Sequence, residues 1–245
     1  SLKSSFLLKS SFAESFRILR SNMYFLLKNK TEHDSKVVLV TSSISGEGKT
    51  TVAANLATVF AISGKKTLLI NMDLRKPRLH EEFDMKNDFG AVNLLVDKDD
   101  LDTVKIATKV NNLDVIFSGP TPPNPSELIV GPRMGKFIDQ ARSKYSRIVI
   151  DSSPMGLVSD TLELFQYADS TIYVIRQDFT RKGMLKMVEE KYENGSITNI
   201  SYVLNFYKAA GKYGYGYDYG KYGYGYVEDN EIPFYRKIFK RKNAK

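Results

Sequence analysis

The chain has 245 residues, 42% of them hydrophobic and 26% charged, which is enough for one large globular domain or two small ones. It has no cysteine and two histidines, so a disulfide scaffold, a cysteine-ligated metal site and a thiol nucleophile are excluded, and a histidine-rich metal site is disfavoured. It has no run of 18 apolar residues, so we expect no membrane-spanning helix in it.

The net charge of +8 is concentrated at the two ends of the chain. Residues 1–30 hold six Lys and Arg against one Glu, and residues 208–245 hold nine against four Asp and Glu, so each end carries +5 and the middle −2. Two interpretations stay open: the basic ends only favour solubility, or they contact anionic lipid or an acidic partner. No motif indicates nucleic acid, which we do not expect as a partner.

The predicted elements begin with a helix over residues 12–28, where Phe12, Phe16, Leu19 and Met23 form one apolar stripe. Short runs rich in valine and isoleucine then alternate with stretches long enough for helices. The predicted strands are 36–41, 67–72, 113–117, 147–150, 170–175 and 200–204, and the later predicted helices are 49–63, 133–145, 159–167 and 183–192. This alternation predicts an α/β fold with a mostly parallel central sheet and helices on both faces.

Tyrosine and glycine alternate in the last part of the chain. Eight of the fifteen tyrosines follow residue 207, and the stretch 212–226 has no aliphatic residue to bury. Such a composition predicts a mobile tail. The predicted organisation is therefore an N-terminal segment over 1–30, a main domain over 31–207 and a basic tail over 208–245. The clustered tyrosines are Tyr213, Tyr215, Tyr217, Tyr219, Tyr222, Tyr224 and Tyr226.

The strongest motif follows the first predicted strand, where the stretch 43–51 reads SISGEGKTT and leads into an apolar helix. A strand, this loop and a helix are the context of a phosphate-binding P-loop, although Ser43 stands at the first glycine position. Backbone N–H groups would cradle phosphate oxygens, Lys49 would reach the β- and γ-phosphates, and Thr50 would ligate Mg²⁺. ATP or ADP with Mg²⁺ is the predicted ligand. The predicted nucleotide-binding residues of the loop are Ser45, Gly46, Glu47, Gly48, Lys49, Thr50 and Thr51.

Two predicted strands end close to an acid that suits Mg²⁺. The run IVID ends at Asp151, and the run LLINMD ends at Asp73. An acid at a strand end is often only a helix cap, but beside a P-loop it is a candidate metal partner. We therefore predict Thr50, Asp73 and Asp151 as the metal-binding residues.

Together, these motifs resemble the cytoplasmic kinase domain of the bacterial tyrosine kinases. These are P-loop autokinases of the polysaccharide co-polymerase type, which act in capsule and exopolysaccharide export. The resemblance rests on six motifs in the same order along the chain. They are E-x-x-R-x-x-R at Glu14, Arg17 and Arg20, Walker A at 43–51, Walker A′ at 71–75, a proline-rich loop at 119–128, Walker B at 151–154 and the tyrosine-rich tail.

The resemblance implies an ATP-dependent protein-tyrosine autokinase that regulates oligomerisation and polysaccharide export. The tail tyrosines of one subunit would be phosphorylated in the active site of its neighbour. Glu14, Arg17 and Arg20 would contact the next subunit of a ring-shaped homo-oligomer, although from the residues alone they suit a solvated helix face. Asn205 would contact adenine, although a strand-end cap is the alternative. A transmembrane activator region, fused or separate, a tyrosine phosphatase and a location at the cytoplasmic face of the bacterial inner membrane are also implied.

The chain departs from the family pattern at Asn71. The resemblance implies Lys49, the residue at position 71, Asp73 and Asp151 as the catalytic residues. The family has Asp at position 71, where it is the implied base for the tyrosine hydroxyl. An amide has the same shape but cannot accept a proton at neutral pH, so we predict binding of Mg-ATP with impaired transfer. Such an isosteric change fits a natural variant as well as an introduced one.

Two other functions remain as alternatives. A partition or positioning ATPase of the same P-loop branch would carry Lys at the second loop position, where Ile44 stands. A nucleotide-gated assembly scaffold would have Asn71 as its native residue and no transfer step. For the tail, the alternative role is a structural one, as a cohesive low-complexity segment.

Overall fold

The computed structural model describes residues 11–27, 34–96, 100–156 and 160–208 of the chain. None of the helices in these ranges combines the length and the apolar character that crossing a bilayer requires. The clustered tail tyrosines, Tyr213 to Tyr226, lie outside the described residues, so their predicted mobility and their role as phosphate acceptors stay predictions.

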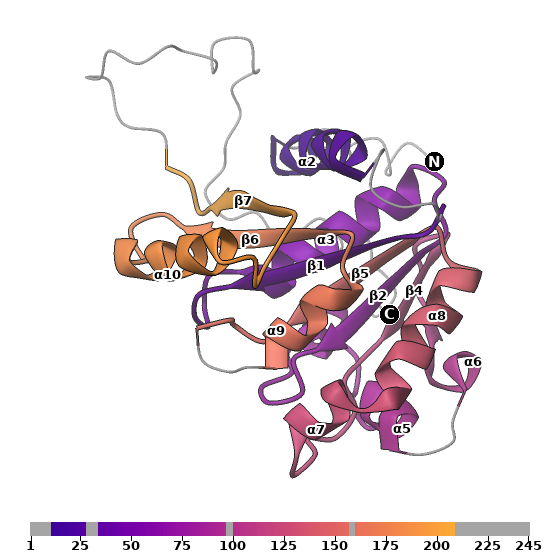
Figure 1. Cartoon of the computed structure of the whole chain (residues 1–245). Coiled ribbons are helices and arrows are strands. Elements are labelled where there is room, and N and C mark those ends of the chain that lie inside the picture. Colours follow the sequence, from indigo (N-terminus) through magenta and orange to yellow (C-terminus); the bar gives the residue numbers. More distant parts are fainter. Residues whose placement is uncertain (1–10, 28–33, 97–99, 157–159, 209–245) are drawn as a thin grey trace.

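A seven-stranded sheet forms the centre of the molecule (Figure 1). The strands are β1 (Lys36–Ser42), β2 (Thr67–Met72), β3 (Ile106–Ala107), β4 (Leu113–Ile116), β5 (Arg147–Ser152), β6 (Ser170–Arg176) and β7 (Ile200–Asn205). Their order in space is β3-β4-β2-β5-β1-β6-β7, and among these described strands only the β3–β4 pair is antiparallel. Because β5 lies between β1 and β2, the carboxyl ends of these three strands are neighbours.

The central strands β1, β2 and β5 are buried at almost every position because both faces of the sheet are covered. Successive side chains of β1 point to opposite faces: Val38 and Val40 join one core cluster, and Val37 and Leu39 join the other. The first cluster includes residues of α2 (Ser11–Leu27), α3 (Lys49–Ile62) and α4 (Leu79–Phe83). The second includes residues of α5 (Ala91–Val96), α6 (Leu101–Val104), α7 (Pro125–Val130), α8 (Pro132–Lys144) and α9 (Asp160–Leu164). Helix α10 (Lys182–Glu193) packs beside β6 through Val188 and Tyr173.

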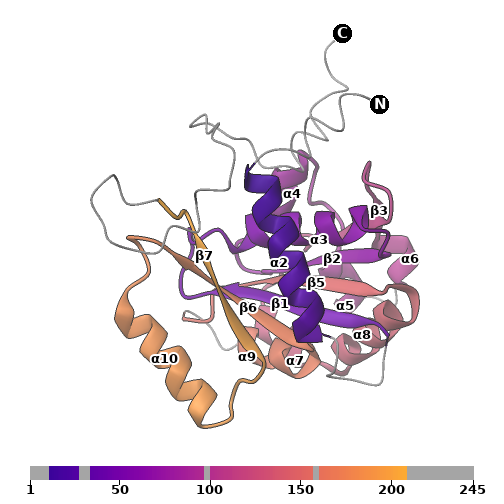
Figure 2. The same cartoon turned by 90° about the horizontal axis from the view of Figure 1, so that it is seen from above.

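Helix α2 lies across α3 (Figure 2). Its predicted apolar stripe is the buried side: Phe16 and Met23 are buried against the core. Three large apolar side chains of α2 are nevertheless exposed, Ile18, Tyr24 and Phe25, the last of them 75% exposed.

The predicted fold class is confirmed, and all six predicted strands are present within two residues of their expected ends. Strand β3 and the short helices α4, α5, α6 and α7 were not predicted. The proline-rich stretch, expected as a loop, contains α7, in which Pro125 occupies the first turn. The single helix expected over 159–167 is shorter, because α9 passes into a 3₁₀ turn at Phe165–Tyr167.

Candidate nucleotide-binding site

The loop after β1 has the backbone of a phosphate cradle. Gly46 and Gly48 have φ values of +92° and +93°, a region that side chains rarely enter, and Gly48 caps the N-terminus of α3. The N-terminal N–H groups of α3 therefore face the space above the loop, where an anion is favoured. A Cβ atom on Gly48 would lie 2.2 Å from Nδ2 of Asn205, so a larger residue would be strained in its backbone and would also displace the Asn205 side chain.

The serine at the first loop position has a structural explanation. Ser43 is buried, and its Oγ accepts a hydrogen bond of 2.9 Å from the hydroxyl of Tyr173 on β6. The departure from the strict P-loop pattern thus anchors the start of the loop to the sheet.

Glu47 is buried, and its carboxylate holds the loop rather than facing the space above it. Its Oε2 accepts from the N–H of Ile44 at 2.8 Å, and its Oε1 accepts from the hydroxyl of Thr180. Any contact of Glu47 with a nucleotide must therefore come from its backbone. Ser45, in contrast to Glu47, is exposed. The Thr51 hydroxyl donates a hydrogen bond of 3.2 Å to Glu82 Oε1.

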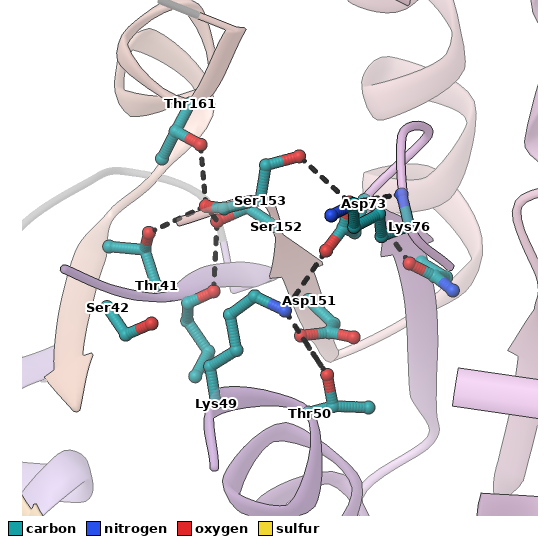
Figure 3. Close-up of polar contacts among 12 residues, drawn as sticks. Thr41, Ser42, Lys49, Thr50, Asp73, Lys76, Asp151, Ser152, Ser153 and Thr161 are labelled. Carbon is teal, nitrogen blue, oxygen red and sulfur yellow. Dashed lines mark hydrogen bonds and ion pairs between the residues drawn. The ribbon is translucent and has the colours of Figure 1, made fainter. Parts of the chain in front are cut away.

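A buried polar cluster lies beside the loop (Figure 3). The Lys49 ammonium forms a 3.1 Å salt bridge with Asp73 Oδ2, and their side chains are 11% and 5% exposed. Thr50 Oγ1 donates to Asp151 Oδ1 at 3.2 Å. The structure thus brings together Lys49, Thr50, Asp73 and Asp151, which come from α3, from the residue after β2 and from β5.

Asp73 is held in place by the segments around it. Its Oδ1 accepts from Ser153 Oγ and from the N–H of Lys76, both at 3.1 Å. Burial acts to lower the pKa of Lys49, but the charges of Asp151 and Asp73 outweigh it and raise that pKa above its usual value. Lys49 is therefore a fixed cation at neutral pH.

The surroundings of Asp151 raise the pKa of its carboxyl group. Burial, together with the negative charges of Asp73 and Glu82, raises its pKa to about 6, although Lys49 and the Thr50 hydroxyl act in the opposite direction. Its Oδ2 atom is buried and has no hydrogen-bond partner within the described part of the chain. A buried carboxylate oxygen without a partner is costly, and a cation or a metal-bound water would relieve that cost.

Asn71 lies directly beside Asp151, since the two are register partners in β2 and β5. Its Oδ1 accepts from the N–H of Asp73 at 3.0 Å. Its Nδ2 group is buried and has no acceptor among the described residues. Among the described residues, these two register partners thus each keep one buried polar atom without a hydrogen-bond partner.

These groups fit Mg²⁺ with a nucleoside phosphate. Mg²⁺ usually keeps several waters and binds through one or two carboxylates together with substrate phosphates, so a larger ligand set is not needed. The described residues contain no group of three or more His, Cys, Asp or Glu that could hold a metal ion. Asp151 Oδ2 suits the cation or its water, and Asn71 Nδ2 suits a phosphate oxygen.

Arg176, Phe179 and Phe206 form a platform beside the loop that the sequence did not predict. The Arg176 guanidinium lies 4.7 Å from the ring centre of Phe179 and 4.1 Å from that of Phe206, and it donates to the Gly46 carbonyl at 2.8 Å. Asn205, at the end of β7, donates from Nδ2 to the Glu47 carbonyl at 3.0 Å. Asn205 was predicted from the resemblance, whereas no pattern pointed to Arg176.

The arginine of the Walker A′ motif points away from the buried cluster. Arg75 forms two hydrogen bonds with Asp160, at 2.7 and 3.2 Å, and donates to Ser126 Oγ at 3.0 Å. Ser126 in turn donates to Asp160 Oδ1 at 2.6 Å. Burial acts to raise the pKa of Asp160, but the bonds from Arg75 and Ser126 lower it below its usual value. Three distant segments are joined in this way, and sequence spacing gave no sign of it.

The predicted subunit-contact residues lie on α2, away from the nucleotide cluster. Glu14 and Arg17 form an i,i+3 salt bridge of 2.9 Å with the side chain of Glu14 59% exposed. Arg20 donates to the carbonyl of Val59 on α3 at 3.3 Å.

Comparisons with known proteins agree with this geometry. The family model of the CobQ/CobB/MinD/ParA nucleotide binding domain matches residues 38–219. The chain is 36% identical over 209 residues to the tyrosine-protein kinase YwqD of Bacillus subtilis, covering 85% of this chain and 87% of that protein. It is 38% identical over 179 residues to the putative tyrosine-protein kinase CapB of Staphylococcus aureus, covering 73% and 77%. The solved kinase domain of the Escherichia coli tyrosine kinase ETK is 30% identical, with a TM-score of 0.75 over 87% of this chain and 85% of that one.

Proposed function

The chain belongs to the family of bacterial tyrosine-protein kinases, and from that premise we propose that it binds Mg-ATP and phosphorylates tyrosines on other copies of this chain. The observation that supports this most is the buried cluster of Lys49, Thr50, Asp73 and Asp151 beside the P-loop. Phosphoryl transfer depends mainly on positioning and charge stabilisation, and this cluster offers both.

In this proposal each member of the cluster has one task. The Lys49 ammonium, kept charged by Asp73 and Asp151, neutralises charge on the γ-phosphate. The Thr50 hydroxyl, Asp73 and Asp151 hold Mg²⁺ directly or through water, and Asn205 with the loop backbone holds the nucleotide. Bound there, Mg²⁺ would supply neutralisation of phosphate charge.

We propose further that Asn71 impairs the transfer step. A tyrosine hydroxyl has a pKa of about 10 in water, so a nearby base speeds its attack. The Asn71 carbonyl oxygen already accepts from the Asp73 N–H, and its other group is a donor. The side chain at position 71 therefore binds a phosphate oxygen better than it accepts a proton. Loss of such a base typically slows a reaction by about 10²–10⁴-fold.

The proposal extends to the assembly of the protein. The tyrosines from Tyr213 to Tyr226 are the proposed acceptors, presented to a neighbouring subunit in a ring that α2 holds together through Glu14, Arg17 and Arg20. A membrane-spanning activator, a tyrosine phosphatase and a place at the inner membrane complete the proposal, with polysaccharide synthesis and export as the regulated process. These parts rest on the family resemblance.

Asn71 also favours a second function. If the residue is native and no other group takes the proton, the chain is a nucleotide-gated assembly ATPase or scaffold. Such a protein would bind ATP and change its oligomeric state without labelling its tail.

Phosphate mapping tests both proposals. The chain and its Asn71→Asp variant are incubated with Mg-ATP, and phosphotyrosine is located by peptide mass spectrometry. We expect the Asp variant to label the tail tyrosines at least about 100-fold faster than the parent chain. An Asn71→Asp, Lys49→Met double variant is the matched control and should remain unlabelled.

Binding of a fluorescent ADP analogue is measured on all variants, so that a folding defect is recognised. Equal labelling of the parent chain and the Asp variant would remove the base role from position 71. Absence of label from both, with nucleotide still bound and assembly size responding to it, would favour the scaffold.

A further inference from the structure

A cleft of about 420 Å³ lies at the edge of the molecule opposite the P-loop. It opens between the C-terminal half of α2, the end of α3 and the first residue of β5. Three basic side chains line it, Arg20, Lys65 and Arg147, together with three aromatic ones, Tyr24, Phe25 and Phe60. Neither the P-loop chemistry nor the buried cluster uses this cleft.

Among the described residues, no salt bridge neutralises the basic side chains of the cleft. Within the described part of the chain, Arg20, Lys65 and Arg147 form none. Within the part of the chain that the structure describes, Arg20 and Arg147 donate to the carbonyl oxygens of Val59, Asp34 and Ser146. Burial lowers the pKa of Arg147, although the nearby Tyr24, Asp169 and Asp34 act to raise it. A partly desolvated guanidinium of this kind gains from an anionic partner.

The end of α3 explains only part of this arrangement. A helix C-terminus attracts cations, which accounts for Lys65 and for the bond from Arg20 to the Val59 carbonyl. It does not account for the aromatic walls, where Tyr24 is 54% and Phe25 75% exposed. Arg147 adds a third cation from the sheet, with its guanidinium 5.9 Å from the ring centre of Phe60. Cations and aromatic rings around one cleft suit a ligand that is both anionic and aromatic.

We propose that this cleft binds phosphotyrosine of the chain's own tail. The inference rests on the proposed function, because a tyrosine kinase activity must supply the phosphate. Each phosphate adds about −1.5 to −2 charge, which suits the three cations, while the tyrosine ring packs against the aromatic walls. Without phosphate the stretch 212–226 carries two Lys and one Asp, so the cleft does not attract it. Tyr226 is eighteen residues beyond Lys208, and an extended chain of that length spans up to about 60 Å.

The position of the cleft gives the proposal a consequence for assembly. Arg20 lines the cleft and also belongs to the proposed subunit-contact set on α2. A phosphotyrosine bound beside it competes with a neighbouring subunit for the same helix.

A synthetic peptide tests the binding without requiring any kinase activity of the chain. The probe is a fluorescein-labelled peptide of residues 212–226 phosphorylated at Tyr219, and the comparison is the same peptide without phosphate. Fluorescence anisotropy is measured with the full chain saturated with Mg-ADP, so that the nucleotide site is blocked. We expect the phosphopeptide to bind at least about tenfold more tightly than the unphosphorylated peptide.

Charge variants locate the site. Lys65→Gln and Arg147→Gln should each weaken phosphopeptide binding about fivefold or more, whereas Lys86→Gln, an exposed lysine outside the cleft, should not. Lys65 is exposed, so its variant keeps the test valid if Arg147→Gln unfolds.

The proposal is overturned by equal affinity for the two peptides, or by phosphopeptide binding that Lys65→Gln leaves unchanged. Equal competition by inorganic phosphate at the same concentration would reduce the cleft to a site for small anions. Cleft-dependent binding seen only with phosphatidylglycerol vesicles would assign it to the membrane instead. If the chain has no kinase activity, these binding measurements are unaffected, since the phosphate is introduced by peptide synthesis.

Discussion

Replacing Gly48 by alanine should destabilise the phosphate loop for two reasons that can be separated, backbone strain and a steric clash. The φ of +93° places a non-glycine residue in the left-handed region, which costs about 1–2 kcal/mol. The new Cβ would also lie 2.2 Å from Asn205 Nδ2 and push that side chain away from the Glu47 carbonyl, with the loss of a hydrogen bond worth about 1 kcal/mol. We therefore expect Gly48→Ala to lower the free energy of unfolding by about 2–3 kcal/mol.

The chain offers a matched control for the backbone cost alone. Gly64 has a φ of +86°, and nothing lies within 4 Å of the position of its Cβ. Gly64→Ala should therefore cost about 1–2 kcal/mol, and the difference between the two variants isolates the clash. In a domain of this size, Gly48→Ala should lower the melting temperature by about 4–12 °C.

The assay is urea unfolding of nucleotide-free protein, followed by titration with a fluorescent ADP analogue. Gly48→Ala should also lose most nucleotide affinity, because the N–H groups at the start of α3 are displaced, whereas Gly64→Ala should keep it. Adding Asn205→Ala to Gly48→Ala should recover part of the stability by removing the clash. The reasoning is refuted if Gly48→Ala costs no more than Gly64→Ala.

Two further predictions concern charge in the site. A carboxyl has a pKa of about 3.9 in the unfolded chain, and Asp151 titrates at about 6 in the folded one, so the folded state holds this proton more tightly. The free energy of unfolding of the nucleotide-free chain should therefore fall as the pH rises from about 4 to about 6. In urea unfolding, Asp151→Asn should stabilise the chain more at about pH 7.5 than at about pH 4.5. An equal stabilisation by the variant at both pH values would contradict this. Arg176→Ala removes the ring contacts with Phe179 and Phe206 and a bond to the Gly46 carbonyl. It should raise the Kd for ADP about tenfold and lower the melting temperature by about 2–8 °C. An unchanged Kd in calorimetry would show that the platform does not support the nucleotide.

The parts of the fold that were predictable are those in which the pattern is local. Strand β1 is buried on both faces, so its run of valines and leucine is continuous and easy to recognise. The two-residue strand β3 is too short to carry any period. The helices α5 and α6 have six and four residues, so they present at most two turns and no clear stripe.

The site divides in the same way. Lys49, Asp73 and Asp151 could be predicted because each stands at the end of a recognisable strand or loop motif. The partners of Arg75 could not, because Asp160 is 85 positions away and Ser126 is 51. Arg176 was not predicted because the two rings that its guanidinium contacts, those of Phe179 and Phe206, come from different turns. They meet only when β6 and β7 pair.

The place of β5 in the sheet has a consequence for how the protein forms during synthesis. Strands β1 and β2 leave the ribosome early, yet the slot between them is filled by residues 147–152, which follow β2 by more than seventy positions. Until that stretch arrives, both strands expose an unpaired inner edge, and Lys49 has no Asp151 to face. Asn205 arrives later still, on the last strand of the order. The proposed nucleotide site is therefore complete only when β1, β2, β5 and β7 are in place, and a nascent chain that carries only the P-loop motif has no complete pocket.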